Sequence, residues 1–151
     1  MNIKFALYTI VFFFVCSCSD EEFNYNYSSN NSFMINVNES SNDNYLLFGN
    51  DRNGKFSGKD PSLTFKVGDK IIFNISATGH PFYLKTKKGI GTDNLIRFVI
   101  NNGTDNGMIS WNAKDNINIK NTYSTQSNIS GKYHYQCSIH KEMYGTINII
   151  D

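Results

Sequence analysis

Apolar and polar residues alternate over two neighbouring segments in the middle of the chain. Every second residue is apolar in residues 63–67, and the same alternation returns in residues 71–75 after Gly68-Asp69. In a strand, successive side chains point to opposite faces, so this period predicts two strands with one buried face each. Gly-Asp between them favours a tight reversal that would make the two strands neighbours.

Short segments of this kind recur along the whole chain. Asn53-Gly54 and Asn102-Gly103 add further turn signals, and no amphipathic helix longer than two turns stands out. The polar stretch 112–130 is expected to be a long connection, with an extra strand around residues 117–119. Such a chain predicts an all-β fold with two sheets packed face to face. The expected strands are residues 33–37, 45–48, 63–67, 71–75, 80–85, 95–100, 107–111, 132–137 and 145–150.

The N-terminus has the form of an export signal. A positive start precedes an apolar run over residues 5–15, and small residues follow. The run is shorter than the about 20 residues of a membrane span. Val15-Cys16-Ser17-Cys18 also resembles a bacterial lipobox, although Cys16 stands where Ala or Ser is usual. The protein is therefore expected to be exported to the periplasm, the cell surface or the medium, either lipid-anchored at Cys18 or freely secreted.

The rest of the chain is expected to form one domain. Residues 1–18 would be the signal and residues 19–31 a polar tether, too poor in apolar residues to offset the entropy of ordering. Residues 32–151 suffice for a single core. A net charge of +1 over 151 residues leaves no basic stripe, so nucleic acid is not an expected partner. Membrane contact is expected only through the N-terminal lipid anchor.

Three potential metal ligands stand within seven residues near the C-terminus. Cys137, His140 and Met143 offer a thiolate, an imidazole and a thioether, and one loop could present all three to one ion. Sulfur ligands favour Cu(I), and two His with one Cys and a weak axial Met is the blue-copper pattern. After processing at Cys18, Cys137 would be the one cysteine of the domain, and a metal would protect its thiol. A disulfide between Cys18 and Cys137 is the alternative.

The second imidazole has two candidates. His80 lies in a short apolar segment that resembles the end of one strand entering another. His134 precedes Cys137 by three residues, so a strand there would turn it to the opposite face. His80 is the predicted ligand. Tyr133, Tyr135 and Trp111 are interpreted as core residues.

Residues 133–145 resemble the last ligand strand and loop of the cupredoxins, the plastocyanin and amicyanin family of blue copper proteins. The Cys-x2-His-x2-Met spacing is that of amicyanin, and His80 followed by Phe82 resembles the upstream ligand segment. The resemblance implies a Greek-key β-sandwich with one copper ion. His80, Cys137 and His140 would be the strong ligands and Met143 the long axial one.

Two departures from the family pattern stand beside the ligands. Pro81 occupies a position that is commonly Asn, whose side chain ties the two ligand segments together in plastocyanin and amicyanin. Lys141-Glu142 replaces a proline and an apolar residue of amicyanin. A softer loop and a different reduction potential are expected.

The resemblance implies a type-1 copper protein that carries single electrons by Cu(I)/Cu(II) cycling between redox partners. Electrons would pass through the exposed edge of His140. A monomer is expected, with transient docking of a redox protein around Ile139, Lys141, Glu142 and Tyr144.

Three alternatives remain open. They are copper delivery or storage, a modified copper site with enzymatic activity as in nitrosocyanin-like relatives, and a metal-free cell-surface β-sandwich for adhesion. Zinc is disfavoured because Met is a poor zinc ligand. No catalytic triad, paired-carboxylate motif or nucleotide loop supports a hydrolase or transferase, so an electron carrier rather than an enzyme is expected.

Overall fold

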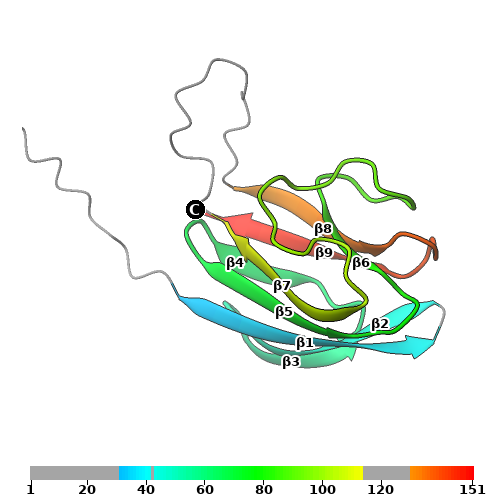
Figure 1. Ribbon diagram of the computed structural model, residues 1–151. Helices are drawn as coiled ribbons and strands as arrows, with labels where there is room; N and C mark the ends of the chain where they lie inside the picture. The colour runs from blue at the N-terminus through cyan, green and yellow to red at the C-terminus, as the bar shows by residue number, and fades with distance from the viewer. Residues whose placement is uncertain (1–30, 42, 114–129) are drawn as a thin grey trace, which may run out of the picture.

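The computed structural model describes residues 31–41, 43–113 and 130–151, and these residues form two β-sheets. The predicted all-β, two-sheet sandwich is confirmed (Figure 1). The five-stranded sheet has the order β3-β2-β1-β5-β7 and the four-stranded sheet the order β4-β9-β8-β6. The described residues contain no helix that could cross a membrane. The strands are β1 (Ser32–Ser41), β2 (Asn44–Asp51), β3 (Gly54–Lys59), β4 (Leu63–Lys66), β5 (Lys70–Ser76), β6 (Phe82–Lys85), β7 (Asn106–Asn112), β8 (Gly131–Cys137) and β9 (Tyr144–Ile150).

Aromatic rings join the two sheets at the centre of the core. Phe82 of β6 lies 5.0 Å from the ring of Tyr45 and 5.2 Å from that of Phe73, both from the five-stranded sheet. It also stacks on Tyr135 of its own sheet at 5.3 Å. Trp111 and Tyr133 are buried as well, so all three aromatic residues that the sequence assigned to the core lie there.

The prediction that the strands on either side of Gly68-Asp69 are neighbours is wrong. β4 pairs in parallel with β9, whereas β5 pairs with β1 and β7 of the other sheet. The turn is a corner between sheets. Gly68 has a φ of 93°, and the buried Asp69 carboxylate accepts hydrogen bonds from the Lys66 N–H at 2.7 Å and the Arg52 Nε at 3.0 Å. These bonds hold the chain as it crosses from one layer to the other.

Two further differences concern individual strands. Residues 95–100 form only isolated bridges at Leu95 and Ile100, because Phe98 has a φ of 60° that breaks the extended backbone. Conversely, β3 pairs with β2 across the Asn53-Gly54 turn. It is a largely exposed edge strand and so has no apolar alternation to reveal it. Asn102-Gly103 turns the chain within the loop before β7. The export signal, Cys18, most of the tether and the expected strand at residues 117–119 lie outside the described residues.

Gly145, the second residue of β9, makes room for an aromatic ring. It pairs with Tyr135, and a Cβ added to it would collide with the Tyr135 ring and hydroxyl. That ring is held, because its hydroxyl donates to the Pro61 carbonyl at 2.8 Å. Gly145→Ala is expected to cost about 1–3 kcal/mol of unfolding free energy, measured by urea denaturation. Gly58→Ala is the control, since an added Cβ there meets nothing; equal midpoints for the two variants would contradict the prediction.

Candidate metal centre

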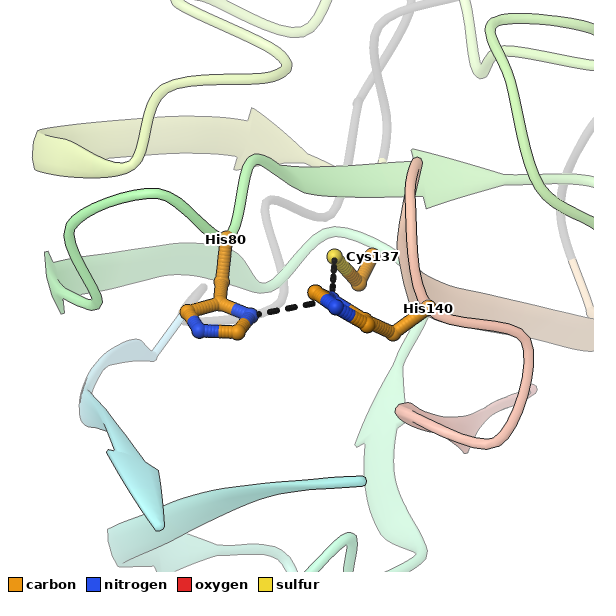
Figure 2. Close-up of side chains that lie close together, drawn as sticks. All are labelled: His80, Cys137 and His140. Atoms are coloured by element: carbon orange, nitrogen blue, oxygen red, sulfur yellow. Dashed lines mark hydrogen bonds between the residues drawn. The ribbon is translucent and has the colours of Figure 1, made fainter. Parts of the chain in front are cut away.

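Three of the predicted ligands come together at the end of β8. A ring nitrogen of His80, a ring nitrogen of His140 and the Cys137 Sγ all lie within 4.8 Å of one another. The two Nδ1 atoms are 3.1 Å apart, and His140 Nδ1 lies 3.5 Å from the sulfur. Figure 2 shows both imidazoles turned toward each other beside the thiol. Cys137 is fully buried, whereas both histidines are half-buried.

The register of the four-stranded sheet explains this meeting. Phe82 pairs with Cys137 in the antiparallel β6–β8 ladder, so the residues before Phe82 lie beside those after Cys137. The Ser138 N–H donates to the Pro81 carbonyl at 3.3 Å and continues the contact past the strands. His80, one residue before Pro81, therefore reaches the loop that carries His140.

The remaining ligands belong to the loop that joins β8 to β9. The Cys137 N–H donates to the Met143 carbonyl at 2.9 Å, and the Met143 N–H donates to the His140 carbonyl at 3.3 Å. The Met143 side chain is fully buried. The loop thus carries Cys137, His140 and Met143 as the sequence suggested, and the axial role of Met143 stays a prediction.

The donor set fits copper. A thiol and two imidazoles suit copper in either oxidation state, and no carboxylate belongs to this cluster. Two nitrogens 3.1 Å apart that bind one ion at about 2.0 Å would subtend about 100° at it. A nitrogen and a thiolate sulfur 3.5 Å apart would subtend about 109° with an ion–sulfur distance of about 2.3 Å. Both angles lie in the range of three- and four-coordinate sites, so His140 is placed to share one ion with His80 and with Cys137.

Tyr45 supports the His80 segment from the opposite sheet. Its hydroxyl lies 2.9 Å from the His80 carbonyl oxygen and 3.1 Å from that of Pro81. Burial, and after it the nearby Cys137, raises the pKa of Tyr45, so its hydroxyl remains a donor. The Pro81 carbonyl also accepts the Ser138 N–H. The two ligand segments are therefore tied through the backbone, where the family pattern would use an Asn side chain.

A loop that the sequence did not implicate also contacts the ligand loop. The Gly91 N–H donates to the Ser138 carbonyl at 2.7 Å. Lys85, 1 % exposed, holds this loop from within, because its ammonium donates to the carbonyls of Gly89 and Gly91. No sequence signal marks this contact, since a lysine at the end of a strand usually lies in solvent.

His134 lies outside the cluster, as its position in β8 predicted. Its Nδ1 is buried without a hydrogen-bond partner. Burial lowers the pKa of His134, and the positive charges of Lys132 and Lys88 lower it further, while a bond to the Gly145 backbone opposes the shift. The folded protein therefore disfavours the charged imidazole at this position.

Because its pKa is lowered in the folded protein, His134 makes the free energy of unfolding depend on pH. Below the ordinary histidine pKa of about 6.5 the unfolded chain binds a proton that folded His134 resists, so stability falls as pH falls through that value. His134→Gln is therefore expected to lose less stability than the wild type when the pH is lowered. Urea midpoints of the metal-free wild type and variant, compared at about pH 7.5 and about pH 5, measure it. If the urea midpoints of the two proteins differed by the same amount at both pH values, the prediction would be contradicted.

Rusticyanin structures are among the solved structures that resemble this chain. Reduced rusticyanin is 16% identical, with 82% of this chain and 81% of that chain covered and a TM-score of 0.44. Rusticyanin from Thiobacillus ferrooxidans is 16% identical, with 82% and 79% covered and a TM-score of 0.44. A third structure, described as a copper protein, is 16% identical, with 82% and 80% covered and a TM-score of 0.46. No protein-family model and no curated protein matches the chain. With its two packed sheets and its buried thiol beside two imidazoles, the chain resembles the cupredoxins in fold and in donor cluster.

Proposed function

We propose that this protein is an exported type-1 copper protein that carries single electrons between redox partners. One observation carries the proposal, the grouping of the Cys137 thiol with the His80 and His140 imidazoles within 4.8 Å. The bound copper would supply the one-electron chemistry by cycling between Cu(I) and Cu(II). His80, Cys137 and His140 would hold it, with Met143 as the axial ligand.

The protein residues would keep the site nearly unchanged during electron transfer. Burial of the Cys137 sulfur keeps water and oxidants from the thiolate, whose ionised state the metal itself would enforce. The bonds from the Cys137 N–H to Met143 and from the Ser138 N–H to Pro81 fix both ends of the loop. Donors held in this way move little when the charge at the site changes, so little reorganisation would accompany each transfer.

The surface beside the site would form a transient docking patch. Ile139 is 60% exposed, Lys141 and Glu142 are exposed, and Tyr144 is half-exposed. His140 lies among them and is only half-buried, which suits an exit for electrons. A mixed apolar and charged surface of this kind fits a brief encounter with another redox protein. We propose that the protein acts as a monomer, with Cys18 as the site of any lipid anchor.

Copper titration of the purified protein tests the function. Adding Cu(II) is expected to give an intense absorption near about 600 nm and an EPR spectrum with narrow copper hyperfine splitting, as for a thiolate-bound type-1 ion. The colour should disappear on reduction and return on oxidation over many cycles. A pale complex would argue for copper delivery or a modified site. No copper binding at all would leave the adhesion alternative.

A further inference from the structure

The side chain next to Cys137 in β8 is buried and contacts the backbone of two predicted ligand residues. Gln136 is 1 % exposed and lies on the face of β8 opposite Cys137. The ligand loop folds over this face. The Gln136 Nε2 lies 2.9 Å from the His140 carbonyl oxygen and 3.2 Å from that of Met143, with the Lys141 carbonyl at 3.4 Å.

These contacts supplement the backbone hydrogen bonds that close the loop, one of which is long. The Met143 N–H donates to His140 over 3.3 Å, a long hydrogen bond. A side-chain amide has two N–H donors, and a carbonyl oxygen accepts two bonds. The amide of Gln136 can therefore bond the His140 and Met143 carbonyls together while both keep their backbone partners. Residues 138–142 contain no proline that would stiffen the loop by itself.

We propose that Gln136 is a positioning residue that sets the geometry of the ligand loop between β8 and β9. By fixing the carbonyls of His140 and Met143, it fixes where their side chains stand relative to the Cys137 sulfur, which shares the strand with Gln136. Partners of this kind, which hold metal ligands without touching the metal, affect metal affinity strongly. The inference rests on the proposed copper function for its spectroscopic consequences, but the positioning itself exists in the metal-free protein.

Gln136→Met tests the role, because methionine has similar length and no N–H donor. Copper affinity is expected to fall about 10-fold or more, with a shifted visible band and broadened hyperfine splitting in EPR. Arg52→Met is the matched control. It removes the Arg52–Asp69 ion pair at the opposite end of β5 from His80, so it lowers stability without touching the loop. The control is expected to keep the wild-type affinity and spectrum.

Amide hydrogen exchange of the metal-free proteins separates this role from the copper function. The N–H groups of Cys137 and Met143 should exchange faster in Gln136→Met than in the wild type, and no faster in Arg52→Met once both are corrected for global stability. If the wild type binds no copper but this difference appears, the positioning stands and the proposed function fails. Wild-type affinity, spectrum and exchange in Gln136→Met would overturn the positioning. Should Gln136→Met fail to fold, Gln136→Glu, with the same shape and no donor when ionised, is judged by the same measurements.

Discussion

Replacing Cys137 by serine is expected to abolish the intense visible absorption of the copper-loaded protein. The absorption of a type-1 site requires a thiolate bound to Cu(II), and Cys137 is the one sulfur of the described His-Cys-His cluster. Serine keeps the shape of the side chain but is a poor copper ligand. Loss of a residue that only supports a metal ligand lowers metal affinity about 10–100-fold. Loss of the ligand itself should lower the copper affinity further. Absorption and EPR spectra after addition of Cu(II) measure the loss.

The His134→Gln variant also provides the control for this experiment. His134→Gln removes an imidazole only three residues from Cys137, but on the opposite side of β8 from the cluster. It is expected to keep the blue colour. Loss of the blue band in His134→Gln, or an intense blue band in Cys137→Ser, would show that copper is not bound by His80, Cys137 and His140.

Phe82→Ala is expected to lower the free energy of unfolding by about 3–5 kcal/mol. Phe82 is fully buried, and three aromatic rings from both sheets surround it. Truncation leaves a cavity between the sheets, directly beside the pairing of Phe82 with Cys137. Urea denaturation of the metal-free protein, monitored by circular dichroism, measures the effect.

The matched control for this variant lies on the outer side of β2. Phe48 is 38% exposed, so Phe48→Ala removes the same atoms with a much smaller loss of buried surface. The difference in unfolding free energy between the two variants measures how much the Phe82 contacts between the sheets contribute to stability. Similar midpoints for both would mean that the ring contacts at Phe82 contribute little to stability.

The sequence predicted the layers of the fold better than their connections. Alternation in β4 and β5 shows that each strand has one buried face, but the same alternation fits partners in either sheet. The crossing at Asp69 depends on Arg52, which is distant in sequence, so the local pattern could not indicate it. β3 could not be predicted, because a solvent-exposed edge strand has no apolar periodicity.

The candidate ligands could be predicted from their spacing in the sequence. The residues that support them, Gln136 and Tyr45, could not. Cys137 and His140 are close in sequence, so chemistry alone suggested a shared loop, and His80 followed as the histidine that strand geometry left available. Gln136 and Tyr45 act on backbone carbonyls in the folded chain. Any buried glutamine or tyrosine has the same appearance in a sequence, so their partners become visible only in three dimensions.

The position of His80 has a consequence for how metal binding and folding depend on each other. His80 lies in the connection that crosses from β5 in one sheet to β6 in the other, while Cys137 and His140 belong to the β8–β9 hairpin. An ion held by all three would cross-link that connection to the hairpin, in a domain whose described cysteine is unpaired. By mass action, free copper at about 1,000 times its dissociation constant would add about 4 kcal/mol to the free energy of unfolding, provided that the unfolded chain does not bind it. Copper would then stabilise the sandwich as a disulfide stabilises many small domains, but as a reversible cross-link whose contribution depends on the copper concentration.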